Sequence, residues 1–93
     1  MSGYTSDQLV ANATADGQMV PTTQRARLTG IQAEGAAGSK IIFKSGGSGG
    51  TAIATFEFGT EGIDFYVPGS GILFDDGIYL DLTATPGVTI TFT

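Results

Sequence analysis

Four aspartates are the residues of this chain whose type and spacing come closest to a chemical site. Asp75, Asp76 and Asp81 are close in sequence, and Asp64 lies on an earlier expected strand. Paired carboxylates can serve a glycosidase, and carboxylate oxygens can bind calcium. However, Asp75 and Asp76 stand in an Asp-Asp-Gly sequence, where aspartate commonly bonds its own backbone in a turn. The Asp-x-Asp-x-Asp-Gly calcium pattern with a closing Glu is absent. We therefore predict turn aspartates, with a weak cation site as the alternative.

Two tyrosines accompany these aspartates at strand spacing. Tyr66 is two residues from Asp64, and Tyr79 is two residues from Asp81. Residues two apart on a strand share a face, so neighbouring strands would show Asp, Tyr, Tyr and Asp together. Such mixtures of aromatic rings and carboxylates occur in carbohydrate-binding sandwiches, and tyrosine is also enriched in subunit interfaces. A sugar site, an interface and plain cross-strand pairing all remain open interpretations.

The chain lacks the usual machinery of catalysis. It contains no His and no Cys, so the common general base and the thiol nucleophile are missing. Ser39-Lys40 and Lys44-Ser45 are strand neighbours whose side chains point to opposite faces. The glycine-rich residues 46–50 are not followed by Lys-Ser or Lys-Thr and join two strands, which favours a hairpin loop over a phosphate-binding loop. We expect a protein that is not an enzyme and has no cofactor or metal.

The size and net charge of the chain disfavour further classes of partner. The chain has 93 residues, which is one domain at most, and its net charge is −5. With only four basic residues, nucleic-acid binding is disfavoured. The start MSGYTSDQLV has no basic and apolar leader pattern, and no apolar run approaches the roughly 20 residues of a membrane span. We expect no membrane partner. Because a small core without disulfides is only modestly stable, we expect a homo-oligomer.

The elements that would position these residues are strands. Apolar residues alternate with polar ones from Arg25 onward, and Gly, Pro and Asp separate the runs. The alternation changes phase at Thr29-Gly30, which predicts a β-bulge. We predict a single all-β domain over 25–93, an antiparallel β-sandwich or jelly-roll-like fold of about seven short strands. The expected strands are 24–33, 40–45, 51–58, 63–67, 72–74, 78–83 and 88–93.

Residues 1–24 are polar and small, and we predict an extended N-terminal arm. A turn or two of helix over 6–15 with Ser6 as its N-cap is the alternative. An arm with apolar residues could lie across a neighbouring subunit. The expected interface residues are Tyr4, Leu9, Val10, Met19, Val20, Tyr66 and Tyr79. The uncharged last strand is expected either in the middle of its sheet or against a neighbour.

About three quarters of the chain resembles small virion proteins of tailed phages, especially marine ones. The segments that carry the resemblance are Arg27-Leu28-Thr29-Gly30-Ile31, Ile42-Phe43-Lys44-Ser45-Gly46-Gly47, Ile63-Asp64-Phe65-Tyr66-Val67-Pro68, Gly71-Ile72-Leu73-Phe74-Asp75-Asp76-Gly77-Ile78-Tyr79 and Val88-Thr89-Ile90-Thr91-Phe92. The resemblance implies a β-sandwich structural subunit, either a head decoration (cement) protein or a knob protein on the capsid, and brings no catalytic residue.

The function expected from the residues and the resemblance together is a non-enzymatic virion structural protein. Its main form is a capsid decoration, or cement, subunit that stabilises a phage head, made in the host cytoplasm and located on the virion. Its partners would be copies of itself, in a trimer for example, and a major capsid or other virion protein. The alternatives are a phage tail, fibre or filament subunit that polymerises by strand addition, and a small glycan-binding sandwich.

Overall fold

A computed structural model describes residues 9–67, 69 and 71–93, which form nine β-strands. Within these residues, no helix is long and apolar enough to cross a membrane. The strands are β1 (Leu9–Ala13), β2 (Gly17–Val20), β3 (Ala26–Glu34), β4 (Ser39–Ser45), β5 (Thr51–Phe58), β6 (Ile63–Tyr66), β7 (Ile72–Phe74), β8 (Ile78–Thr83) and β9 (Gly87–Phe92).

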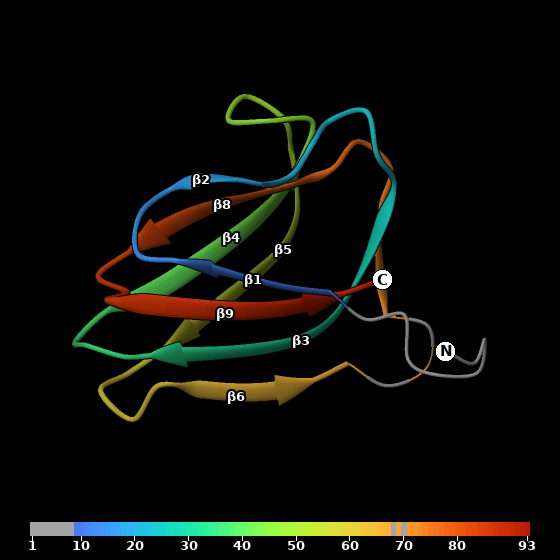
Figure 1. Cartoon of the computed structure of the whole chain (residues 1–93). Coiled ribbons are helices and arrows are strands. Elements are labelled where there is room, and N and C mark those ends of the chain that lie inside the picture. The colour runs from blue at the N-terminus through green and yellow to red at the C-terminus, as the bar shows by residue number, and fades with distance from the viewer. Residues whose placement is uncertain (1–8, 68, 70) are drawn as a thin grey trace.

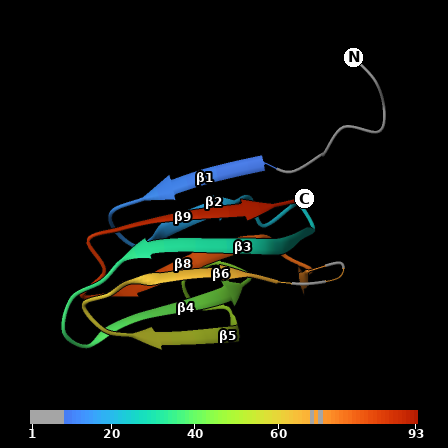
Figure 2. The ribbon, with the colours of Figure 1, turned by 90° about the horizontal axis from the view of Figure 1, so that it is seen from below.

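The strands form two antiparallel sheets packed face to face (Figures 1 and 2). The first, here called sheet A, has the order β1-β9-β3-β6, with β7 also paired to β3; the second, sheet B, has the order β2-β8-β4-β5. Only the connections from β4 to β5 and from β6 to β7 stay within one sheet, so the chain repeatedly crosses between layers. This alternation is the jelly-roll form of the β-sandwich. The predicted fold class is therefore confirmed.

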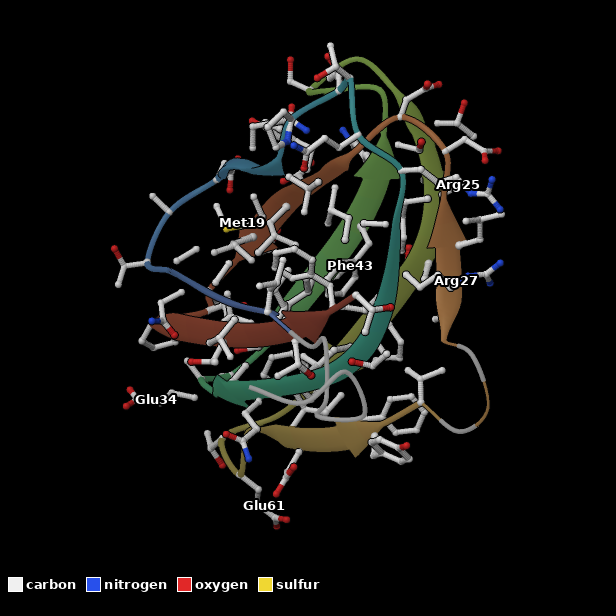
Figure 3. All side chains as sticks on the ribbon, turned by 45° about the vertical axis from the view of Figure 1, so that its right-hand side comes forward. Met19, Arg25, Arg27, Glu34, Phe43 and Glu61 are labelled. Atoms are coloured by element: carbon white, nitrogen blue, oxygen red, sulfur yellow. The ribbon has the colours of Figure 1, made fainter. Side chains whose placement is uncertain are left out.

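The core lies between the two sheets and is made by the inward residues of the alternating runs. Phe43, in the middle of the molecule in Figure 3, is fully buried, and its ring meets Phe56 edge-on and Phe74 at a tilt. Such aromatic contacts stabilise a fold beyond the burial of their area. The buried cluster is Val20, Ala26, Leu28, Ile31, Ile41, Phe43, Phe74, Ile78, Leu80, Val88, Ile90 and Phe92.

The predicted bulge is present in β3. The register with β9 shifts between Leu28 and Gly30. Leu28 faces the core before the bulge, and Ile31 faces it afterwards. Leu28 and Ile31 are three residues apart, a spacing that would put them on opposite faces of a regular strand. The extra residue of the bulge keeps both on the inner face.

The structure differs from the expected N-terminal arm. Residues 9–20, which fall within the segment 1–24, contribute β1 and β2 as edge strands of the two sheets, and there is no helix in 9–15. β1 pairs with β9 and β2 pairs with β8, both near the other end of the chain. Backbone pairing with distant strands stabilises a segment whose own alternation is weak, and local sequence cannot reveal it. Ser6 and Tyr4 lie outside the described residues.

The last strand, β9, lies between β1 and β3 in the middle of sheet A. This is one of the two positions expected for an uncharged strand. The backbone of β9 is paired on both sides within its own chain. The edge strand that could pair with another chain is therefore β1 and not β9.

Candidate functional site

The four aspartates do not converge. Asp64 lies on β6 of sheet A and Asp81 lies on β8 of sheet B. Asp76 belongs to a turn: its N–H donates to Ser45 Oγ at 3.0 Å, and its carbonyl accepts from the N–H of Gly46 at 3.0 Å. No group of three acidic, His or Cys side chains in the part of the chain described here could hold a metal ion. Asp75 and Asp76 occupy the turn between β7 and β8, and both of these contacts of Asp76 are made by its backbone.

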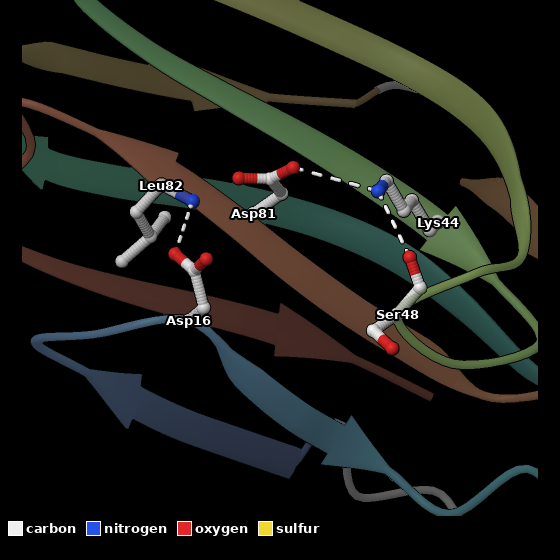
Figure 4. A network of polar contacts seen from close by, with 5 residues as sticks. All are labelled: Asp16, Lys44, Ser48, Asp81 and Leu82. Carbon is white, nitrogen blue, oxygen red and sulfur yellow. Dashed lines mark hydrogen bonds and ion pairs between the residues drawn. The ribbon is translucent and has the colours of Figure 1, made fainter.

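Asp81 belongs to a polar network on the outer face of sheet B (Figure 4). Its Oδ2 lies 3.4 Å from Lys44 Nζ, and the same ammonium donates to the carbonyl of Ser48 at 3.0 Å. Lys44 therefore joins β8 to the glycine-rich loop after β4. Beside it, Asp16 Oδ1 accepts the N–H of Leu82 at 2.7 Å. Asp16 directly precedes the short strand β2, and its carboxylate accepts a backbone N–H of β8 that β2 does not reach. Asp16 and Asp81 therefore both have structural roles.

Tyr66 and Tyr79 also lie apart. Tyr66 is on β6 at the edge of sheet A, whereas Tyr79 is on β8 inside sheet B. The joint face of two tyrosines and two aspartates required neighbouring strands, and β6 and β8 belong to different sheets. The alternation of residues predicts which side chains of a strand share a face, but it does not predict the sheet to which the strand belongs.

The expected interface residues are distributed unevenly. Leu9, Val10 and Tyr66 are 57%, 60% and 68% exposed. Met19, labelled in Figure 3, is partly buried against the core, and Val20 is 2% exposed within it. Val20 therefore supports the fold of its own chain.

The exposed apolar residues mark the edges of both sheets. Among the described residues, the exposed large hydrophobic side chains all belong to edge strands: Leu9 and Val10 on β1, Ile53 on β5, and Phe65 and Tyr66 on β6. β1 and β2 contact each other along one side of the sandwich. On the opposite side, the Phe56 and Phe65 rings bring β5 and β6 together. Among the described residues, the molecule thus has two different sides that combine edge strands with exposed apolar side chains.

A groove of about 660 Å³ crosses the outer face of sheet A. This volume is within the roughly 300–1,000 Å³ usual for ligand pockets. Its side chains are amides, carboxylates and hydroxyls over a small apolar floor, without Lys or Arg. The lining residues are Asn12, Ala13, Thr14, Gln32, Ala33, Glu34, Glu61, Ile63, Asp64, Gly87, Val88 and Thr89.

The register of sheet A builds the centre of this groove. Asn12 is paired with Thr89, Thr89 with Gln32, and Gln32 with Asp64, across β1, β9, β3 and β6. Directly opposed residues project from the same face, so these side chains form one row. Thr89 Oγ1 donates to Asn12 Oδ1 at 2.6 Å and orders one end of it. The outward position of Gln32 and Thr89 is readable from the sequence, but their alignment with Asn12 is not.

Charge is unevenly placed along β3. Glu34 and Glu61 lie at one end of the strand in Figure 3, beside the groove, and Arg25 and Arg27 lie at the other end. The groove is therefore acidic, which disfavours anionic ligands.

The strand order, the groove and the exposed edge residues define a jelly-roll domain with a polar groove on one face and two apolar edges. No family model and no curated protein matches the chain. A solved Bacillus endospore appendage protein, from a family described as disulfide-linked pili, is similar with a TM-score of 0.54 and 24% identity. The match covers 92% of this chain and 82% of that one. At this identity the likeness shows the fold alone. The resemblance to tailed-phage virion proteins stays a prediction.

Proposed function

We propose that this protein is a non-enzymatic structural subunit that assembles with copies of itself into a surface filament or appendage. The observation that carries the proposal is the position of the exposed apolar side chains, which gather on edge strands at two opposite sides of the sandwich. The similar fold of a protein that forms pili supports this function over an enzyme or a carrier.

The edge backbone provides the means of assembly. β1 and β2 contain no charged residue and no proline, the usual devices that prevent edge strands from pairing with another chain. On the opposite side, Ile53 of β5 is 43% exposed and Phe65 of β6 is 41% exposed. Strand addition between the β1/β2 side of one copy and the β5/β6 side of the next would pair free backbone groups and cover this apolar surface.

The two sides differ, so the contact is head-to-tail. A head-to-tail contact propagates into an open filament unless the rotation between copies closes a ring. Self-association would also add buried apolar area to a small domain that has no cysteine for a disulfide. A filament subunit is therefore favoured over an isolated domain.

The test is negative-stain electron microscopy of the purified chain and of two charge variants, Val10→Lys on β1 and Ile53→Lys on β5. We expect filaments of constant width from the unmodified protein. Each variant places a charge in one side of the contact and should lower filament yield roughly tenfold or more. Circular dichroism should show that both variants remain folded.

Gln32→Lys is the matched control. Gln32 is also exposed, but it lies on β3 inside sheet A, so its charge sits on a sheet face and not on an edge. The control should assemble normally. Filaments that survive both edge substitutions, or that disappear only with Gln32→Lys, would show that the faces and not the edges make the contact.

Capsid decoration is a second proposal, favoured by the segments that resemble tailed-phage virion proteins. Its partners would be a few copies of the same chain and a capsid protein. Discrete oligomers in light scattering, such as trimers, without filaments at any concentration would support it over the filament.

A further inference from the structure

We infer that the groove on the outer face of sheet A binds a neutral oligosaccharide, with Tyr66 as its stacking platform. This goes beyond self-assembly, because the centre of the groove, Gln32 and Thr89, lies on the inner strands β3 and β9 of sheet A, whereas the proposed assembly uses the edge strands. The two proposals can therefore fail independently.

The polar row supplies the hydrogen-bonding groups that a sugar needs. Asn12 and Gln32 present amides that donate and accept, Asp64 accepts, and the Thr89 hydroxyl, whose proton is donated to Asn12 Oδ1, accepts. Each sugar hydroxyl is likewise a donor and an acceptor. The four residues stand on adjacent strands in register, about 4.8 Å from one strand to the next. This spacing is close to the length of a pyranose unit, so an oligosaccharide lying across the strands could meet one polar group per sugar.

A second hollow of about 210 Å³ extends the groove to an aromatic ring. It shares Gln32, Asp64 and Thr89 with the main groove and reaches Tyr66, which is 68% exposed. The Tyr66 ring can pack against the C–H face of a sugar while its hydroxyl stays in water.

Gly30 keeps this end of the groove open. It is the register partner of both Tyr66 and Thr91, so it sits beside the ring in the middle of the sheet. A Cβ at this position would lie 2.5 Å from Thr91 Oγ1. With no side chain there, one flank of Tyr66 is uncovered, and a ligand can approach it.

The charge of the groove selects the class of sugar. Glu34, Glu61 and Asp64 line it, and neither hollow has a Lys or Arg in its lining. Phosphorylated, sulfated and uronic-acid glycans would be repelled. The competing ligand is a cation such as a polyamine, but attraction to charge alone would not require the Tyr66 ring or an amide row.

The experiment is isothermal titration calorimetry of the full chain with short neutral oligosaccharides. The series are built from glucose, mannose or N-acetylglucosamine and increase in length. We expect binding that strengthens with chain length until the row is filled. Tyr66→Ala and Gln32→Ala should each weaken it by roughly tenfold. Tyr79→Ala, on the outer face of sheet B, is the matched control and should bind as the unmodified protein does.

The other outcomes overturn the inference. No binding of any of these sugars at about 1 mM would remove the ligand class. Equal losses of sugar affinity in Tyr66→Ala and Tyr79→Ala would show that the sugar does not bind in this groove. If spermidine displaces the sugar and high salt abolishes binding, the groove attracts ligands by its negative charge alone and does not recognise a sugar. Filaments that form normally in Gln32→Ala, a substitution on the inner strand β3, would leave the assembly proposal intact whatever the result for sugar binding.

Discussion

The rings of Phe56 and Phe65 lie with their centroids 5.5 Å apart and tilted by 47°, and they join the edge strands of opposite sheets. Phe56 in turn meets the buried Phe43 at 5.8 Å. A continuous series of aromatic contacts therefore runs from the middle of the core to the β5/β6 side. The same side that is proposed to contact another subunit is held in shape by these rings.

Phe65→Ala should lower the free energy of unfolding by about 1–2 kcal/mol, less than a fully buried phenylalanine would, because 41% of Phe65 is exposed. Urea denaturation followed by circular dichroism measures the change. Tyr66→Ala, on the next and more exposed residue, is the control and should change stability by no more than about 0.5 kcal/mol. Equal effects of the two substitutions would mean that the ring contact contributes nothing.

Gly77→Ala should destabilise the fold much more than Gly38→Ala. The two glycines have nearly the same backbone angle, φ of 79° and 76°. A side chain in this left-handed region costs about 1 kcal/mol, which is the loss expected for Gly38, where a Cβ would meet nothing within 4 Å. At Gly77 a Cβ would lie 2.4 Å from the carbonyl oxygen of Val20, so the strand β2 would also have to move.

Chemical denaturation of the Gly77 and Gly38 variants side by side tests this difference. We expect the Gly77 variant to lose at least about 1 kcal/mol more than the Gly38 variant. Indistinguishable midpoints would contradict the close packing of the turn before β8 against the chain after β2.

Ser39→Ala should cost about 1–2 kcal/mol of stability. Ser39 is 2% exposed; its Oγ accepts the N–H of Ala36 at 2.7 Å and donates to the carbonyl of Ala84. One hydroxyl thus ties the turn before β4 to the turn after β8. Thermal unfolding measures the loss, and Ser48→Ala in the exposed loop after β4 is the control. An unchanged melting temperature for Ser39→Ala would show that these turns hold without the hydroxyl.

Assembly should be insensitive to reductants. The structurally similar appendage proteins are described as disulfide-linked, but this chain has no cysteine. The proposed assembly uses backbone pairing and apolar contact and no disulfide, so dithiothreitol should leave its filaments intact. Urea should dissociate it instead. Electron microscopy after each treatment is the measurement, and filaments that fall apart in reductant alone would contradict the prediction.

The strands after Arg25 could be predicted because their information is local. The expected 51–58, 72–74 and 78–83 coincide with β5, β7 and β8, since a period of two marks the buried face and glycine, proline and aspartate mark the turns. The bulge at Gly30 was readable for the same reason.

β1 and β2 could not be predicted because their stability comes from pairing partners. Ala11 and Ala13 are small, and the polar residues around them favour no element by themselves. Ala11 is opposite Ile90 and Ala13 is opposite Val88 in the register with β9. The same non-local pairing places Asn12 beside Thr89 and so completes the polar row of the groove.

The sequence by itself determined the all-β class, most of the strands, the buried face of each and the lack of cysteine. It could do so because side-chain alternation, turn chemistry and composition are properties of neighbouring residues. The tertiary structure decided the order of the strands, the separation of Tyr66 from Tyr79 on different sheets, and the groove shared by β1, β9, β3 and β6. These depend on which backbones pair across long stretches of chain, and a strand with a given alternation can be built into either sheet.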